Sequence, residues 1–472
     1  MKMKFMYCAS AIAVVAASTL MLTASQSQAP AKYDPAIETQ TTIGDGFTFA
    51  AVGDVIMPLP TSNWSDAAFQ SALKPLKDSD VAYGQFEMTS VDLDDFKGAY
   101  FPGPAMISDP SVAEDFKKMG FDAFSRATNH GFDLGLEGML ASNAHLEDAG
   151  LVVVGSGKNY GAAWAPRYFM TPKGRVAFVA TTTAMWAQAP VLARAAVESG
   201  EASGHGGVAL MRVAQTFVVP RSLQSALDTI RKALPTGGGL YAPLDDTADR
   251  ISVMGQKFRF ADVLRPEFSY DPNKEDVAAA LKSVREGKLK SDFLSFGMHV
   301  HEHRYPDKPD TDPIPGDFLQ PFAHQVIDAG ADQFVGTGVH NLRGIEIYKG
   351  RVIFYGLGEY FRQMDINKIG RGPARGDQNS DPEKFESVLA VTRYQGGKLA
   401  EVKLYPVEAR ETARMALRGL PQTPSSEVAQ KILKRLQGLS EPYGTKINVV
   451  GDVGYITLQG APPAAQPARR RG

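Results

Sequence analysis

Cysteine is almost absent from this sequence: Cys8 is the single one among 472 residues, and it lies early in the N-terminal segment. The rest of the chain can form no internal disulfide and offers no thiol nucleophile. Any metal would therefore be held by nitrogen and oxygen ligands. An excess of one charge is missing too, because 50 Lys and Arg oppose 52 Asp and Glu and leave a net charge of −2. That balance provides no global attraction to nucleic acid, so we expect no nucleic-acid partner.

Long apolar runs are absent outside one N-terminal stretch. Lys2 and Lys4 precede an apolar run from about residue 9 to residue 24, and small residues follow up to Ala31. This order is typical of a secretory signal peptide, and the run is short for a membrane span. We therefore expect residues 1–31 to be a cleavable signal peptide and the protein to be periplasmic or secreted, with the membrane touched only transiently. An uncleaved N-terminal membrane anchor is the alternative.

The rest of the chain has the composition of a globular protein, 44% hydrophobic and 22% charged, and is long enough for one large α/β domain or two smaller ones. Residues 32–46 are polar and rich in Thr and Gly, so we expect a linker there. Strand-like and helix-like segments then alternate over residues 47–410. Such alternation favours stacked β–α units over an all-β sandwich.

Two parts of the chain depart from this regular pattern. Residues 184–290 contain Gly-rich stretches, with helices expected at about 222–234 and 274–287, and we interpret them as an insertion or lid. Residues 411–459 are expected to form a C-terminal helix and strands that pack on the core. Residues 460–472 are rich in Pro and end in arginines, which indicates a disordered tail.

Histidine is also scarce, with eight in the chain, yet five of the eight gather in three short stretches. The stretches are 127–131, 297–303 and 335–340, and each sets imidazoles beside glycines. Histidine is the commonest transition-metal ligand and the usual proton-transfer group near neutral pH. The clustering therefore predicts metal or acid–base chemistry.

Polar side chains stand at or just after the ends of the expected strands. These side chains are Asp54, Glu87, Asn129 with His130, His299 and His340. The carboxyl ends of the strands in an α/β sheet form the crevice where ligands bind, so we expect these groups to converge. Carboxylate, amide and imidazole donors together make a mixed nitrogen and oxygen metal site. Each residue alone also has a plainer interpretation, such as a turn, and their shared position favours the site.

The order and spacing of these segments carry a resemblance to a known family. The matching segments lie between about residues 47 and 360 and include Gly53-Asp54, Phe86-Glu87, Thr128-Asn129-His130, His299-Val300-His301-Glu302, Gly338-Val339-His340 and Ile353-Phe354-Tyr355-Gly356-Leu357-Gly358. The chain resembles the poly-γ-glutamate capsule-synthesis proteins, the CapA-like branch of the calcineurin-type metallophosphatase superfamily. The resemblance implies an α/β fold, a four-layer α-β-β-α sandwich of two facing sheets, here with a long insertion.

The resemblance also implies a set of metal ligands at the strand ends. Asp54, Glu87 and His340 would hold one divalent ion, and Glu87, Asn129 and His299 a second, with Glu87 bridging the two. One or two ions of Mn, Fe, Zn or Mg are compatible with these donors. Paired ions of this kind activate a water and clamp the oxygens of an in-line displacement.

Three further residues are candidates for contact with substrate. By the resemblance, His130 would be the catalytic proton donor or charge stabiliser and not a ligand. Arg212 and Arg343 are weaker candidates, because an arginine can receive an anionic substrate through forked hydrogen bonds. The substrate would be an anionic polymer or a small phosphorylated or carboxylated molecule.

The chain departs from the superfamily pattern at three positions. Ile56 stands where the first motif usually has a histidine, and Gly338 replaces the first histidine of the last motif. Glu359 stands where the family usually has Asn. The second ion would keep only three protein ligands, and His301 or Glu302 could substitute from the same loop.

Three functions remain open on these grounds. The first is an exported metal-dependent hydrolase that acts on a phosphoester or a related ester or amide bond in capsule or surface-polymer metabolism. The second is a non-catalytic accessory in poly-γ-glutamate synthesis or export. The third is an enzyme that uses its metal as a Lewis acid on a non-phosphate substrate, and the incomplete ligand set shifts weight towards the last two.

Overall fold

The computed structural model describes most of the chain beyond residue 40. The described ranges are 41–98, 105–184, 193–198, 203–234, 247–306, 312–363, 382–409 and 417–458. The expected signal peptide or anchor at 1–31 and the expected tail at 460–472 lie outside them. Within the described ranges, no helix combines the length and the apolar character that crossing a membrane requires.

The larger sheet has a parallel half and an antiparallel half. Its main path runs β23-β24-β21-β20-β1-β2-β5-β6, with β19 paired to β1 and β22 paired to β21. Its strands are β1 (Thr48–Ile56), β2 (Val81–Phe86), β5 (Ala123–Ser125), β6 (Val152–Val154), β19 (Glu359–Arg362), β20 (Glu386–Gln395), β21 (Lys398–Ala409), β22 (Pro421–Gln422), β23 (Asn448–Val450) and β24 (Val453–Thr457). The strands β19, β1, β2, β5 and β6 are parallel, so their carboxyl ends share one edge.

The second sheet has the order β17-β18-β16-β15-β9-β8. Its strands are β8 (Arg167–Thr171), β9 (Gly174–Thr182), β15 (Phe293–His299), β16 (Gln333–Thr337), β17 (Ile345–Tyr348) and β18 (Arg351–Phe354). The four central strands are parallel, and β17 and β18 form a hairpin joined at Lys349 and Gly350. Both turn residues have positive φ, 50° and 75°, as a two-residue hairpin of this hand requires.

An apolar core lies between the two sheets. The ring of Phe49 on β1 lies 6.1 Å from that of Phe178 on β9 and 5.6 Å from that of Phe293 on β15. The buried residues Leu433 and Leu436 of α10 (Ser426–Ser440) belong to the same core, and α10 contacts β17, β21 and β24. The C-terminal helix therefore packs on both sheets.

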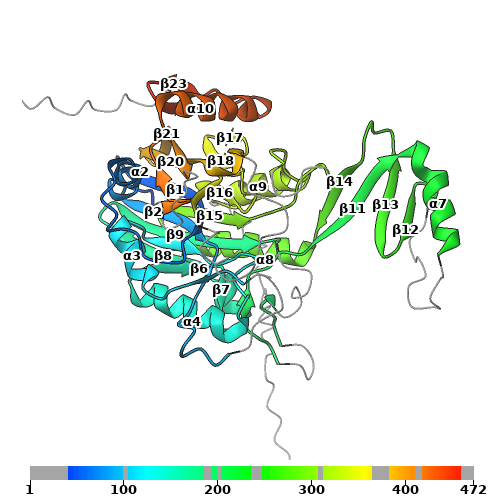
Figure 1. The fold of residues 1–472 in the computed structure, drawn as a ribbon, viewed down its shortest axis with the longest axis horizontal. Coiled ribbons are helices and arrows are strands. Elements are labelled where there is room, and N and C mark those ends of the chain that lie inside the picture. The colour runs from blue at the N-terminus through cyan, green and yellow to red at the C-terminus, as the bar shows by residue number, and fades with distance from the viewer. Residues whose placement is uncertain are drawn as a thin grey trace, which may run out of the picture. The chain divides into compact units, whose positions relative to one another are not determined.

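Helices cover the outer faces of both sheets (Figure 1). On the larger sheet lie α2 (Ala67–Lys77), α3 (Val112–Met119) and α4 (Gly135–Asp148), and on the second lie α5 (Tyr160–Trp164), α8 (Lys274–Lys288) and α9 (Leu319–Asp328). Apolar residues recur along these segments with the period of a helix, so they line one side of each helix. That side packs on the sheet. The four-layer α-β-β-α sandwich predicted from the sequence is confirmed.

The insertion contains a small sheet of its own, which the sequence did not predict. It has the order β12-β13-β11-β14, built from β11 (Val213–Pro220), β12 (Arg250–Val253), β13 (Gln256–Ala261) and β14 (Glu267–Pro272). The helices in the described part of the insertion that accompany this sheet are η1 (Arg221–Leu223) and α7 (Gln224–Ala233). Helix α8 was placed in the insertion, but its buried Ala280 and Val284 pack on the second sheet. The expected boundary at residue 290 is therefore wrong, and α8 is part of the core.

Shorter elements complete the described chain. They are β3 (Thr89–Ser90) paired with β4 (Ile107–Ser108), β7 (Ser156–Gly157) paired with β10 (Gly207–Val208), η3 (Pro382–Phe385) and η5 (Glu441–Tyr443). The end of the expected linker, residues 41–46, is also structured, because Ile43 is buried in the core between the sheets and the Gly44 amide donates to the Lys173 carbonyl at 2.7 Å. The linker prediction is wrong for this part.

Candidate metal centre

The expected site residues lie at the carboxyl edge that the parallel strands share. Glu87 directly follows β2, and His299 is the last residue of β15. Asp54 lies within β1, which continues to Ile56. The pairing of β1 with β19 changes register directly after Asp54. His340 follows β16 and has a positive φ of 56°. A histidine in this region of conformational space is strained, and such strain concentrates at functional sites.

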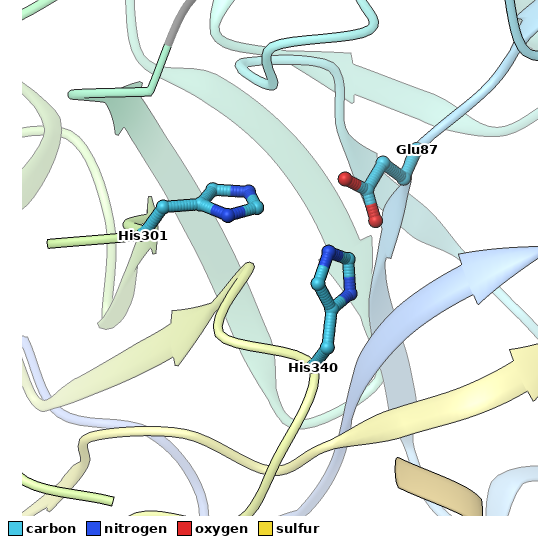
Figure 2. A group of neighbouring side chains, drawn as sticks. All are labelled: Glu87, His301 and His340. Atoms are coloured by element: carbon cyan, nitrogen blue, oxygen red, sulfur yellow. The ribbon is translucent and has the colours of Figure 1, made fainter. Parts of the chain in front are cut away.

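Glu87, His301 and His340 form a compact trio. One potential ligand atom from each residue lies within 4.8 Å of those of the other two. Figure 2 shows the Glu87 carboxylate and the two imidazole rings facing a common space. The residues come from the segments that follow β2, β15 and β16, so the trio depends on the parallel strands of both sheets. His301, which the sequence offered only as a substitute ligand, is central to it.

His299 links the trio to the other expected ligands. Its Nε2 lies 2.8 Å from Asn129 Oδ1, 3.1 Å from His301 Nε2 and 3.4 Å from Glu87 Oε1. Its Nδ1 lies 3.4 Å from Asp54 Oδ1. The imidazole of His299 therefore stands between the two buried carboxylates. Asn129 is brought to the same place, as predicted.

Asp54 adjoins His299 and His340. Its Oδ2 accepts the backbone N–H of Gly338 at 2.9 Å and is 4.0 Å from His340 Nδ1. Asp54 is fully buried, as are Glu87 and His299. Burial, above all, and the negative charge of Glu87 raise the pKa of Asp54.

The buried charges of the centre are only partly compensated by the protein. Neither oxygen of Glu87 accepts a hydrogen bond from the residues that the structure describes. Burial alone would raise the pKa of Glu87, but the neighbouring histidines, His299 first, lower it overall. Burial likewise disfavours a charge on His299, yet Glu87 and Asp54 raise the pKa of His299 to about 9. A divalent cation fits this arrangement, since it would add positive charge between the two buried carboxylates and bind the Glu87 oxygens that accept no hydrogen bond.

His130 is held beside the centre by Asp133. Its Nδ1 lies 2.7 Å from Asp133 Oδ2, and both side chains are buried. Asp133 also accepts the backbone N–H of Met106 at 2.8 Å, which fixes the carboxylate. Thr89 donates its hydroxyl to the His130 carbonyl at 3.0 Å. This pairing sets the orientation of the His130 ring beside the centre.

Comparison with known proteins assigns the chain to a family. The model of the family described as "Bacterial capsule synthesis protein PGA_cap" matches residues 48–364. The chain belongs to this family. The match spans the second sheet, the parallel strands of the larger sheet and every residue of the centre. The resemblance found in the sequence is confirmed.

Three relatives of the chain illustrate the range of similarity. The "Uncharacterized protein y4sH" of Sinorhizobium fredii is 36% identical over 459 residues, which is 90% of this chain and 96% of the relative. The "Probable polyglutamine synthesis accessory protein Rv0574c" of Mycobacterium tuberculosis is 30% identical over 38% of this chain and 41% of its own. The "PGA biosynthesis protein CapA" of Bacillus subtilis is 32% identical over 21% of this chain and 26% of its own.

The two arginines expected to receive substrate are engaged within the protein. Arg212 donates from Nε and Nη2 to Asp276 at 2.7 and 2.9 Å, in the first turn of α8. Arg343 is fully buried and donates to the carbonyls of Glu302 at 2.9 Å and Asp312 at 3.3 Å. Its contact with Glu302 supports the segment that carries His301. The structure therefore gives both guanidinium groups partners within the protein.

Glu359 is a residue of the centre to which the sequence assigned no role. It lies at the start of β19, opposite Asp54 in the pairing of β19 with β1. Its Oε1 is 2.8 Å from His340 Nδ1, and its Oε2 contacts Arg362. The sequence signal for Glu359 was that it stands where the family usually has Asn. Its meaning depends on the β1–β19 pairing, which the sequence does not reveal.

Proposed function

We propose that this member of the capsule-synthesis family is an exported metal-dependent hydrolase. Its substrate would be a phosphoester, or a related ester or amide, in an anionic surface polymer or a small phosphorylated or carboxylated molecule. The observation that carries the proposal is the trio of Glu87, His301 and His340, in which the buried Glu87 carboxylate accepts no hydrogen bond from any described residue. The names of two relatives, which refer to polyglutamine synthesis and PGA biosynthesis, support the link to poly-glutamate.

The donor set fits a divalent ion such as Mn, Fe, Zn or Mg. Glu87, His301 and His340 would hold one ion, while Asn129 and His299 offer adjacent donors for the same ion or a second. When bound, such an ion lowers the pKa of a water and stabilises negative charge on the reacting oxygen. The ligands come from the ends of rigid strands, which keeps the donors in place.

His130 is proposed to move the proton. Protonated at both nitrogens, it would give the Nε2 proton to the departing oxygen or nitrogen as the bond to the leaving group breaks. The Nδ1 proton would stay on the side of Asp133, 2.7 Å away, so that the neutral ring keeps one tautomer. Because His130 is buried, the transfer would take place in a site with little competing water.

Export is proposed from the order of charged, apolar and small residues over 1–31. The test is to express the full chain with a C-terminal tag and to determine its cellular fraction and its N-terminal residue. A mature N-terminus near Lys32 in the periplasm or medium supports export. Retention of Met1 in the membrane fraction contradicts cleavage and favours the anchor.

The second candidate is a non-catalytic accessory in polymer synthesis or export. The word "accessory" in the name of the Mycobacterium tuberculosis relative favours it. So do Ile56 and Gly338, which stand where the superfamily pattern has imidazoles. Use of the metal as a Lewis acid on a non-phosphate substrate is the third possibility, and the same experiment separates all three.

The test combines metal analysis with turnover. The protein is stripped with chelator and reloaded with Mn²⁺, Fe²⁺, Zn²⁺ or Mg²⁺, and its metal content is measured. Hydrolysis of an aryl phosphate, an aryl phosphodiester and a γ-glutamyl anilide is then assayed. Glu87→Gln is compared with Glu346→Gln, a matched control, because the Glu346 carboxylate also contacts an imidazole, that of His324 at 2.9 Å, outside the trio.

Each outcome decides between the candidates. Metal-dependent turnover that Glu87→Gln removes and Glu346→Gln keeps supports the hydrolase. Metal at background level in the natural chain contradicts it and favours the accessory. Bound metal without hydrolysis of any of these bonds also contradicts it and favours the Lewis-acid enzyme.

A further inference from the structure

Arg126 is a fully buried cation beside the centre that the proposed chemistry does not use. It directly follows β5, and its backbone N–H donates to the Val154 carbonyl of β6 at 2.8 Å. Burial lowers the pKa of Arg126 to about 10, so the guanidinium still carries its charge at neutral pH. Removing a charge from water is costly. The contacts of this guanidinium therefore show what the charge stabilises.

The hydrogen bonds of the guanidinium go to the two residues that flank Glu87. Nη1 of Arg126 donates to the Phe86 carbonyl at 2.8 Å and also to the Met88 carbonyl. Nε and Nη2 make no hydrogen bond to a described residue. The guanidinium carbon lies 5.2 Å from the centre of the Phe86 ring, where the face of the ring attracts a cation. The buried charge thus acts on the backbone around a single residue of the trio.

These contacts restrict the direction of the Glu87 side chain. On the other side of the segment, the Glu87 backbone N–H donates to the Val55 carbonyl of β1 at 3.3 Å. The rotamers open to a side chain depend on the backbone conformation of its own residue. Because the backbone is held before and after Glu87, few directions remain for its carboxylate. Neither oxygen of that carboxylate accepts a hydrogen bond from a described residue, so the backbone has to provide the direction.

Arg126 also begins the loop that carries His130. The loop turns back tightly, since a Cβ at Gly131 would lie 2.8 Å from the Arg126 carbonyl oxygen. The negative charge of Asp133, which lies 2.7 Å from His130 Nδ1, opposes the effect of burial on the pKa of Arg126. Arg126 therefore joins the segment of Glu87 to the loop of His130.

We propose that Arg126 is a positioning residue: by holding the backbone on both sides of Glu87, its guanidinium directs the Glu87 carboxylate into the space that the trio encloses. Figure 2 shows the carboxylate facing this space. The inference rests on the proposed function in one respect, that the trio holds a divalent cation. Residues that orient a metal ligand typically change metal affinity about 10–100-fold when they are lost.

Replacement of Arg126 by Met tests this role. Met fills much of the same space and keeps an apolar contact with the Phe86 ring, but it donates no hydrogen bond to either carbonyl. We expect the affinity for Zn²⁺ to fall about 10–100-fold. A bound Co²⁺ ion should lose the carboxylate as a ligand, so its visible absorption spectrum should move towards that of Glu87→Gln. A loss of stability alone would not change the set of ligands.

The experiment measures affinity, ligand set and stability separately in the full chain. Zn²⁺ affinity comes from competition with a chromogenic chelator, the ligand set from the spectrum at saturating Co²⁺, and stability from urea unfolding. The matched control is Lys288→Met, which also removes a buried cation, 6% exposed, that donates to a backbone carbonyl, that of Asp292 at 3.0 Å. Lys288 lies outside the centre, so this control should lose stability but keep the natural affinity and spectrum.

A second variant covers the case in which Arg126→Met does not fold. Arg126→Lys keeps the buried charge, but the lysine side chain ends one atom short of the position of Nη1 and lacks the guanidinium fork. Its ammonium should hold the two carbonyls less well. We expect an affinity about tenfold lower and a Co²⁺ spectrum between those of the natural chain and Glu87→Gln.

The two proposals can fail independently. A natural chain that binds neither Zn²⁺ nor Co²⁺ overturns the proposed metal centre and, with it, this role of Arg126. A natural chain that binds both ions, while the folded Arg126 variants keep its affinity and spectrum, overturns the role of Arg126 alone. Lower affinity with an unchanged spectrum also overturns it, because the ligand set would then not depend on Arg126. An equal change in Lys288→Met would do the same.

Discussion

Replacement of His130 by Ala should separate proton transfer from metal binding. His130 is buried, and its Nδ1 lies 2.7 Å from Asp133 Oδ2. In the proposed mechanism His130 is not a metal ligand. His130→Ala removes the proton donor and leaves the donors of the trio in place. We therefore expect the metal content to stay near that of the natural chain while hydrolysis nearly disappears.

The magnitude depends on the leaving group. A positioned general acid contributes about 10²- to 10⁴-fold in rate, which corresponds to about 3–5 kcal/mol of transition-state stabilisation. An alkyl phosphate has a basic leaving oxygen that needs a proton, so the full loss should fall on it. A nitrophenolate leaves without a proton, so His130→Ala should slow an aryl phosphate far less. Asp133→Asn should give an intermediate loss, since the ring of His130 stays but loses its fixed tautomer.

The assay compares kcat for alkyl and aryl phosphates with metal content in the same samples. The matched control is His145→Ala, which removes a half-buried imidazole from α4 that contacts the Ser90 carbonyl at 3.0 Å. This control should keep both activities. Equal loss on both substrates, or a parallel loss of metal, would refute the role of His130 as an acid and make it a support of the centre.

Three other predictions concern residues of the fold that are not ligands of the centre. Gly297→Ala should lower the free energy of unfolding in urea by about 1–3 kcal/mol, because the new Cβ would lie 1.9 Å from the Tyr83 hydroxyl. If adding Tyr83→Phe to Gly297→Ala restores none of this stability, the clash with the hydroxyl is not the cause. Arg343→Met should cost about 1–3 kcal/mol and weaken Zn²⁺ binding, since the Glu302 carbonyl loses its donor; unchanged unfolding and binding would disprove the support. Burial raises the pKa of Tyr443 from 10 to about 12. The neutral phenol therefore contributes its full stability below pH 10, and this contribution is lost as the pH rises to 12. A urea midpoint that does not change between pH 10 and 12 would contradict this pH dependence.

The sequence predicted the parts of the site that depend on strand ends. Glu87 and His299 end two parallel strands, and alternation of strands and helices was enough to place both at one edge. It offered His301 only as a substitute ligand and assigned no role to Glu359. Residues spaced by two on an extended segment share a side, so the choice between His301 and His303 needed the packing of the loop. Glu359 needed the pairing of β19 with β1, a contact between segments about 300 residues apart.

The fold shows the same division between local and distant information. Helices expected at 222–234 and 274–287 occur as α7 (Gln224–Ala233) and α8 (Lys274–Lys288), because apolar periodicity is a local property. Whether a helix belongs to the insertion or to the core depends on its partner. The apolar side of α8 packs on β9 and β15, while α7 has no buried residue. Periodicity alone could not distinguish these two environments.

The insertion and the metal centre are connected through one segment of chain. Phe268 on β14 lies 5.4 Å, ring to ring, from His303, and its backbone N–H donates to the Arg304 carbonyl at 2.7 Å. Tyr270 on the same strand donates its hydroxyl to the His303 carbonyl at 3.0 Å. His303 is two residues from His301, so the sheet of the insertion holds the segment that supplies one member of the trio. The insertion, which the sequence suggested as a lid, thus supports the segment that carries His301, the ligand that the sequence left undecided.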